Sequence, residues 1–340
     1  MALRITIVGL GLVGSSMGLA LKKSGANQSR RGGTEYLEIV GHDKSHEAAR
    51  NAHKIKCVDR TEWNLISACD GADLVVISTP LAEIKTTLAA IAAELKEGCV
   101  VTDTASLKIP VLNWAGECLP GTAPFVGGHP ILGKLDAQAA PATLSEPSAS
   151  LFEGAVYCLT PAPNAPSAAM QRVSDLVEAL GATPYFMDPA EHDGLVAVGE
   201  QLPLLMALAL QDVAQASPAH REIARLSGAE FDHVTQPLAG DARQLSEVCD
   251  LNAANIARWM DALLSRLSRL RESLAHPPSS EEQAQEREWL EKAFSKALEA
   301  RARWSQPEGV GRETDYSDFS AARMMLGDAF RSRPKDGEKR

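Results

Sequence analysis

The first half of the chain alternates short apolar runs with amphipathic runs of helical spacing. Runs rich in β-branched residues predict strands at 4–10, 37–43, 72–80, 99–104 and 123–129. Helical patterns predict helices at 15–25, 45–54, 82–98 and 168–181, and the last is followed by a strand at 183–187. Near-continuous apolar strands separated by crossover helices indicate an α/β fold, with a parallel sheet buried on both faces.

The second half changes to a purely helical pattern. Long helices are predicted at 195–214, 245–275 and 280–304. In the second of these, one apolar stripe recurs at three- and four-residue spacing: Ile256, Trp259, Met260, Leu263, Leu267 and Leu270. Such a stripe needs a partner helix, from the same domain or from a second subunit, and we expect a homodimer through this region.

The change of pattern predicts three parts. We expect a sheet domain over 1–188, an all-helical substrate and dimerisation domain over 189–305, and a partly disordered C-terminal extension over 306–340.

Composition narrows the class of partner. A net charge of −10 and 5% aromatic residues argue against nucleic acid and favour a small-molecule substrate. Six scattered cysteines lack metal-ligand spacing, so we expect buried free thiols and no metal. The N-terminal segment lacks the features of a signal peptide, and no apolar run reaches about 18 residues without a charge. We therefore expect a cytoplasmic protein that does not contact a membrane.

A glycine-rich loop follows the first predicted strand. "GLGLVG" places Gly9, Gly11 and Gly14 in GxGxxG register, with Leu12 and Val13 between the last two, immediately before a predicted helix. Glycine at these positions allows a tight turn, close approach of a pyrophosphate to the backbone, and close packing of helix on strand. The loop therefore predicts a Rossmann-type dinucleotide-binding domain.

Two further segments complete the expected cofactor site. Asp43 ends the second predicted strand, where a carboxylate can bind the adenosine ribose and repel a 2′-phosphate. It lies 29 residues after Gly14, because a polar insertion at 27–36 lengthens the connection. "STP" (Ser78, Thr79 and Pro80) ends the third strand beside the same site. We expect NAD as cofactor, while Lys44, Arg30 and Arg31 leave NADP open.

One histidine falls at the sheet edge where the nicotinamide would lie. Because the carboxyl ends of parallel strands meet at one edge, "TDTASLK" and "GGHP" bring Ser106, Lys108 and His129 together there. An imidazole at this place can take a proton while hydride leaves for NAD. The alternative is a turn histidine that only hydrogen-bonds a nearby carbonyl.

The chain resembles the prephenate/arogenate dehydrogenase family over residues 4–260. The resemblance rests on "GLGLVGSS", "HD" at 42–43, "STP", "DTASLK", "GGHPILGK", "LFEGAVYCLTP", "ALGATPYFMDPAEHD" and "CDLNAANI", in matching order and spacing. It implies NAD(P)-dependent oxidative decarboxylation of a cyclohexadienol in tyrosine biosynthesis. It also implies that His129 accepts the proton, that Ser106 orients this histidine and binds the substrate hydroxyl, and that His192 and Asp193 are the pair that opens the helical domain.

The substrate-binding half departs from the family pattern. "EQLPL" (200–204) stands where the family has "SHLPH", so Gln201 and Leu204 replace both histidines, and the carboxylate-binding arginine and a following tryptophan align with Gln236 and Leu245. Glutamine cannot supply the charge of a guanidinium. The substrate-binding residues we expect are Lys108, Lys134, His192, Gln201 and Gln236.

Three explanations of this departure stay open. The alignment could be shifted, so that Arg221, Arg225 or Arg243 binds the carboxylate. Another cation could bind it, such as Lys134 or an arginine of the second subunit. The protein could instead act on a different cyclohexadienyl or hydroxy-acid substrate. Outside enzymes, the alternative is a protein that binds NAD without turnover.

Overall fold

The structure is a computed structural model of the chain, and it describes residues 3–24, 37–132, 146–275 and 281–304. The chain forms two compact units, Met1–Ala253 and Ala254–Arg340, and each is described by itself. The polar insertion with Arg30 and Arg31, the expected substrate residue Lys134 and the C-terminal extension lie outside the described residues.

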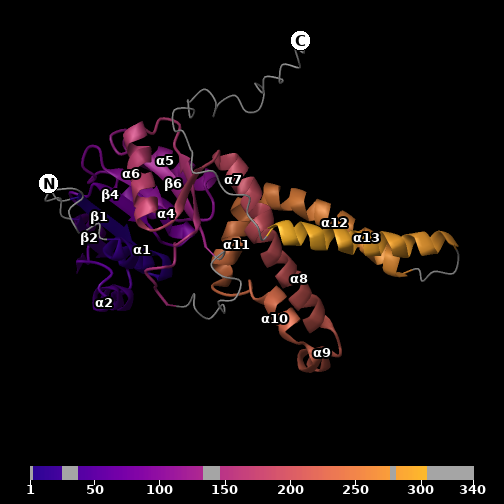
Figure 1. Cartoon of the computed structure of the whole chain (residues 1–340). Helices are drawn as coiled ribbons and strands as arrows, with labels where there is room; N and C mark the ends of the chain where they lie inside the picture. The colour runs from indigo at the N-terminus through magenta and orange to yellow at the C-terminus, as the bar shows by residue number, and fades with distance from the viewer. Residues whose placement is uncertain (1–2, 25–36, 133–145, 276–280, 305–340) are drawn as a thin grey trace, which may run out of the picture. The chain divides into compact units, whose positions relative to one another are not determined.

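The first unit is built on one eight-stranded sheet with the order β3-β2-β1-β4-β5-β6-β7-β8. Its strands are β1 Leu3–Val8, β2 Leu37–His42, β3 Arg60–Thr61, β4 Leu74–Ile77, β5 Val100–Asp103, β6 Phe125–Ile131, β7 Val156–Pro161 and β8 Thr183–Phe186. The reversal of strand order beside β1 opens the crevice in which parallel α/β sheets bind ligands. Helices such as α1 (Leu12–Lys23) and α4 (Leu81–Ile91) pack against this sheet (Figure 1). The predicted α/β class is confirmed, and the strand order reverses between β1 and β4.

The prediction of an all-parallel sheet is wrong at one pair of strands. β6 and β7 run antiparallel, with His129 opposite Cys158, while the other neighbours are parallel. The sequence pattern did not predict β7 as a strand, although its residues are apolar and buried. An antiparallel pair has no crossover helix to signal it along the chain. His129 consequently lies inside β6 and not in a turn after it.

Helices cover both faces of the sheet, as the doubly buried strands require. On one face α1 (Leu12–Lys23), α2 (His46–Lys54) and α6 (Ser167–Ala179) share a core with β-strand residues such as Ile7 and Val76. On the other face α3 (Leu65–Cys69), α4 (Leu81–Ile91) and α5 (Ile109–Cys118) pack on Val75 and Ile77. Alternate residues of β4 therefore face opposite cores.

Two helices differ from their expected bounds. α4 ends at Ile91 and not at 98, and the chain turns before β5. α5 was not predicted from the sequence, although Pro110 in its first turn is typical of a helix start.

The remaining helices of the first unit are α7 (Pro189–Val196), a π-helical turn η3 (Ala197–Gln201), α8 (Leu202–Ala216), α9 (His220–Leu226), α10 (Ala229–Thr235) and α11 (Ala242–Leu251). An α-helix through η3 would need a hydrogen bond from the nitrogen of Pro203 to the carbonyl of Gly199, and proline has no N–H. Pro203 therefore interrupts the α-helical hydrogen-bond ladder beside the π turn, and such turns are frequent at functional sites.

The compact units divide after Ala253, later in the chain than the expected boundary at 188. Contacts between α11 and α4, and between α7 and α5, join this helical region to the sheet. The expected helix over 245–275 is two helices, α11 and α12 (Ala253–Ala275), because Asn252 interrupts it. α12 and α13 (Glu281–Trp304) make up the described part of the second unit.

One helical run among the described residues, Pro189–Ala216, is long and apolar enough to cross a membrane by length and composition. These two properties also describe the core helix of a globular domain, so they are weak evidence for a span. The run buries the polar side chains of His192, Asp193 and Gln201, which hydrogen-bond other parts of the first unit. These hydrogen bonds are those of a helix packed within a protein.

Candidate active site

The glycine loop leaves a space above the start of α1. A Cβ on Gly9, whose φ is +96°, would lie 2.4 Å from the carbonyl oxygen of Ser78, and one on Gly14 would lie 1.9 Å from that of Gly9. A Cβ on Gly11 would meet nothing within 4 Å. Gly11 is also the N-cap of α1 and has no side-chain cap, so the first N–H groups of the helix face this space. The loop can thus accept a pyrophosphate at the positive end of the helix.

Two polar side chains flank this space. The Asp43 carboxylate accepts hydrogen bonds from the backbone N–H groups of Leu10 and Ser45, each at 2.7 Å, and so ties the loop to the end of β2. Its remaining lone pairs can accept from ribose hydroxyls. The buried hydroxyl of Thr79, like those of Thr102 and Thr160, has no partner within the described residues, so it is free to hydrogen-bond a ligand. These residues fit a dinucleotide.

Lys44, which left NADP open, pairs with a carboxylate in the structure. Its ammonium contacts Glu83 in the first turn of α4, and its side chain remains largely exposed. The ion pair joins the end of β2 to the start of α4. A 2′-phosphate would have to compete with Glu83 for this charge.

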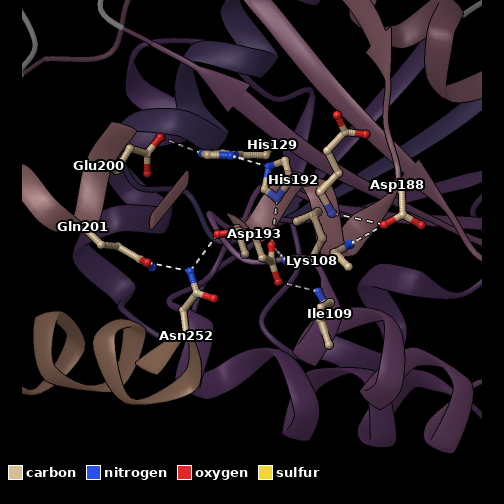
Figure 2. Close-up of polar contacts among 12 residues, drawn as sticks. Lys108, Ile109, His129, Asp188, His192, Asp193, Glu200, Gln201 and Asn252 are labelled. Carbon is tan, nitrogen blue, oxygen red and sulfur yellow. Dashed lines mark hydrogen bonds and ion pairs between the residues drawn. The ribbon is translucent and has the colours of Figure 1, made fainter. Parts of the chain in front are cut away.

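His129 is buried near the C-terminal end of β6 and belongs to a chain of three side chains. Its Nδ1 lies 3.0 Å from Nε2 of His192, whose Nδ1 lies 2.8 Å from Oδ1 of Asp193. Asp193 also accepts the backbone N–H groups of Lys108 at 2.8 Å and Ile109 at 2.9 Å, at the start of α5 (Figure 2).

These hydrogen bonds define the tautomer of each imidazole. A carboxylate only accepts, so His192 must donate from Nδ1 to Asp193. Its Nε2 then carries a lone pair and accepts from Nδ1–H of His129. Nε2 of His129 is left as a lone pair, which is the form that a general base requires.

An ion pair lies directly behind this histidine. The Lys108 ammonium is 2.5 Å from both Oδ2 of Asp103 and the carbonyl oxygen of Gly128, and both charged side chains have no exposed surface. Burial lowers the pKa of Lys108, and the Asp103 carboxylate opposes that shift. Burial, followed by the charges of Lys108 and His192, holds the pKa of His129 well below 6.5. The imidazole of His129 is therefore neutral at physiological pH.

The expected substrate residues differ in their burial and in their contact with His129. His192 joins His129, whereas Lys108 is enclosed beneath it and offers no surface to a ligand. Gln201 is buried and hydrogen-bonds Asn252 at 2.7 Å and the carbonyl of Val248 at 3.4 Å. Gln236, at the C-cap of α10, is exposed. No hydrogen bond joins Ser106 to His129 among the described residues, and Ser106 is half-buried.

The three arginines considered as alternative carboxylate-binding residues do not contact the histidines of the site either. Arg221, Arg225 and Arg243 are exposed, and among the described residues none of their side chains forms a hydrogen bond or ion pair with His129, His192 or Glu200. Leu204 is half-buried on α8.

Sequence reasoning missed three polar members of the site. Asp103 ends β5 and accepts backbone N–H groups from Ala105 at 2.9 Å and Gly128 at 3.0 Å. Asn252 donates to the carbonyl of Asp193 at 2.9 Å. Glu200, in the π turn, brings Oε1 to 3.5 Å from Nε2 of His129. The segments "DTASLK" and "CDLN" contained signals for Asp103 and Asn252, but no local pattern indicates Glu200.

Two family models together cover most of the described chain. The model described as prephenate dehydrogenase, nucleotide-binding domain, matches residues 18–185, and the one described as prephenate dehydrogenase, dimerization domain, matches residues 188–294. The chain belongs to the prephenate dehydrogenase family.

Individual members of the prephenate dehydrogenase family are similar over different spans. The chain is 32% identical to a prephenate dehydrogenase of Bacillus subtilis over 61% of its own length, and it spans about half (52%) of that relative. It is 26% identical to a cyclohexadienyl dehydrogenase of Zymomonas mobilis, over 87% of this chain and 94% of the other.

Solved structures of the family share the fold. The crystal structure of prephenate dehydrogenase from A. aeolicus, in complex with hydroxyphenyl propionate and NAD+, is 24% identical to this chain. It aligns with a TM-score of 0.73, over 88% of this chain and 98% of that one. At this identity the likeness concerns the fold.

The buried ion pair behind His129 generates a stability prediction. Lys108→Met leaves the Asp103 charge buried without its partner and should lower the free energy of unfolding by about 3–5 kcal/mol. The double variant Asp103→Asn with Lys108→Met removes both charges and should regain most of this loss. Urea unfolding followed by circular dichroism measures both. A loss below about 1 kcal/mol in Lys108→Met would show that the pair contributes little.

Proposed function

We propose that this protein catalyses the NAD-dependent oxidative decarboxylation of a cyclohexadienol, with prephenate or arogenate as substrate, in tyrosine biosynthesis. The observation that carries the proposal is the neutral imidazole of His129. Its unprotonated Nε2 belongs to a residue near the C-terminal end of β6, in the same sheet whose β1 leads into the glycine loop. Membership of the prephenate dehydrogenase family supports the reaction class, and the relatives' names include both prephenate and cyclohexadienyl dehydrogenase.

Each residue of the site has a separate role in this proposed reaction. Bound NAD supplies the hydride acceptor. His129 takes the proton of the ring hydroxyl as hydride leaves the carbinol carbon, so the C–O bond becomes a carbonyl. Loss of carbon dioxide then leaves its bonding electrons to the ring, which becomes aromatic, and the ring oxygen, now a phenolate, takes a proton back from His129. Asp193 and His192 keep the His129 lone pair available, and we assign Ser106 to the substrate hydroxyl.

The expected substrate residues Gln201 and Gln236 supply no positive charge for a carboxylate. Gln201 is occupied within the protein and Gln236 carries no charge, so neither replaces a guanidinium. This observation favours a second candidate, a related cyclohexadienyl or hydroxy-acid substrate with a different anionic group. Turnover of prephenate, arogenate and simple hydroxy acids with NAD and NADP, followed at the nicotinamide absorbance, tests both.

His129→Asn tests the proposed base. Asparagine keeps a hydrogen-bonding group but cannot take the proton, so turnover should fall by roughly 10²–10⁴-fold while NAD affinity stays unchanged. Steady-state kinetics and calorimetric titration of NAD measure the two effects. Turnover within threefold of the wild type would make His129 a structural histidine.

Cofactor selection should depend on the ion pair between Lys44 and Glu83. We expect the wild type to bind NAD more tightly than NADP, because Asp43 repels a 2′-phosphate and Glu83 occupies Lys44. Glu83→Gln should release Lys44 and raise NADP affinity several-fold with little effect on NAD. Glu94→Gln, an exposed carboxylate outside this ion pair, is the matched control. Equal binding of both cofactors by the wild type contradicts the expectation.

We also propose a homodimer that forms through the helical region. The matched family model is described as a dimerization domain, and exposed apolar side chains follow α12, among them Leu264 at 54% and Leu267 at 46%. Of the predicted stripe, Ile256 is buried within the chain, and Leu267 is exposed.

The free cysteines, of which Cys118 and Cys249 are only half-buried, fit a reducing cytoplasm.

Leu264→Glu tests the dimer. A symmetric interface buries this leucine twice, so the variant should weaken dimerisation by at least roughly 10²-fold. Ala262→Glu adds the same charge at an exposed position on the opposite face of α12 and should leave the dimer intact. Light scattering across a concentration series distinguishes them. A monomeric wild type at micromolar concentration would overturn the proposal.

A further inference from the structure

Glu200 places a carboxylate beside the lone pair of His129. It lies in the π turn Ala197–Gln201, and its Oε1 is 3.5 Å from Nε2 of His129 (Figure 2). Both atoms are hydrogen-bond acceptors, because the tautomer of His129 leaves a lone pair on Nε2 and a carboxylate only accepts. Two acceptors that face one another have no hydrogen to share. A ligand group that enters between them must therefore supply the donors.

The Glu200 carboxylate lacks a cationic partner in the part of the chain that the structure describes. Lys108, the ammonium beneath His129, is already paired with Asp103 and with the carbonyl of Gly128. Although 43% of the side-chain surface of Glu200 is exposed, burial raises the pKa of its carboxyl to about 7, and no cation opposes this shift. A positive group of the ligand would stabilise the carboxylate form.

A ring hydroxyl can donate to only one of the two acceptors. It has one O–H, and the proposed reaction directs this proton to Nε2 of His129. The lone pairs of the hydroxyl oxygen would then face the carboxylate of Glu200 without a hydrogen between them, unless Glu200 is protonated. An amino group at the same ring position has two N–H donors, and three as an ammonium. It can donate to Nε2 and to Oε1 at the same time.

The position of Glu200 also defines which atom of the substrate it would meet. In the proposed reaction, His129 acts at the ring carbon that loses hydride, so a carboxylate beside Nε2 lies at that carbon as well. The carboxylate and the side chain of prephenate or arogenate are attached at the opposite end of the ring. The geometry therefore favours an amine in place of the ring hydroxyl, and not an amino group on the side chain.

We propose that the site accepts a cyclohexadienyl amine, in which an amino group replaces the ring hydroxyl of prephenate, and that Glu200 selects this group. The inference rests on the proposed function, because it uses the same base, cofactor and decarboxylation. The ammonium donates one N–H to Oε1 of Glu200 and another to Nε2 of His129. Glu200 is thus a specificity-determining residue that contacts the reacting group.

Atoms and electrons balance for an amine substrate. One N–H proton of the ammonium passes to Nε2 of His129 and leaves a neutral amine. The ring carbon then gives hydride to NAD, and the nitrogen lone pair forms a C=N double bond. Carbon dioxide leaves, the electrons of the broken C–C bond enter the ring, and the product is an aromatic amine. Because this product keeps two N–H hydrogens, the third proton of the ammonium is released to water.

Binding of two saturated ring acids tests Glu200 without turnover. The probes trans-4-aminocyclohexanecarboxylate and trans-4-hydroxycyclohexanecarboxylate differ only in the group that would meet Glu200. In calorimetric titrations with NAD present, the wild type should bind the amine roughly 10–10²-fold more tightly, which is the range of a charge-assisted hydrogen bond. Glu200→Gln should lose this preference.

Glu191→Gln is the matched control for this titration. Glu191 is an exposed carboxylate on the same helical run, so its variant should keep the wild-type preference for the amine. The inference is overturned if the wild type binds the amine no better than the hydroxy acid, or if the preference survives in Glu200→Gln. NAD affinity of each variant shows that its sheet domain is folded.

Turnover distinguishes failure of this inference from failure of the proposed function. We expect the ratio of kcat/KM for the amino counterpart of prephenate to that for prephenate to exceed one in the wild type. It should fall by roughly 10–10²-fold in Glu200→Gln and stay constant in Glu191→Gln. If prephenate or arogenate is oxidised and the amine is not, the inference is wrong and the proposed function stands. If only the amine is oxidised, the inference stands and the hydroxyl substrate is wrong. If none is oxidised, the proposed function fails and the binding comparison decides the inference.

Discussion

The site depends on one carboxylate, that of Asp193, at the start of α5. It accepts two backbone N–H groups, from Lys108 and Ile109, and the Nδ1–H of His192. Charge-assisted hydrogen bonds at the positive end of a helix are among the stronger ones in proteins. They hold α7 against α5 and orient His192, and His192 in turn leaves the lone pair of His129 on Nε2. The contact of α7 with α5 and the tautomer of His129 thus depend on the same carboxylate.

The buried ion pair between Asp103 and Lys108 determines the electrostatic environment of His129. Removing two charges from water is costly, and the pair is tolerated because further bonds from Gly128 and Ala105 complete it. The ammonium beneath His129 disfavours a second positive charge and keeps the imidazole neutral. Lys108, expected as a substrate residue, has no exposed side-chain surface, and its charge helps to lower the pKa of His129.

The departures from the family pattern are concentrated in the helical region. Asn252 donates to the side-chain oxygen of Gln201 and to the carbonyl of Asp193, so amides hold this part of the first unit together where the family pattern has an imidazole. The π turn that ends at Gln201 also turns Glu200 toward His129. The change from "SHLPH" to "EQLPL" thus alters the polarity of the site and places a carboxylate beside His129.

The sequence by itself determined the α/β class, the glycine loop and the place of His129 near a strand end, because each follows from periodicity or from residues close along the chain. The family relationship was also visible there, in the order of short motifs. Only the tertiary structure decided the antiparallel direction of β7 beside β6, the burial of Lys108 and the approach of Glu200 to His129. These depend on residues far apart in sequence, such as Asp193 and Lys108, which are 85 positions apart. No local pattern records such a contact, because burial and hydrogen bonding with distant elements determine what a polar side chain can do.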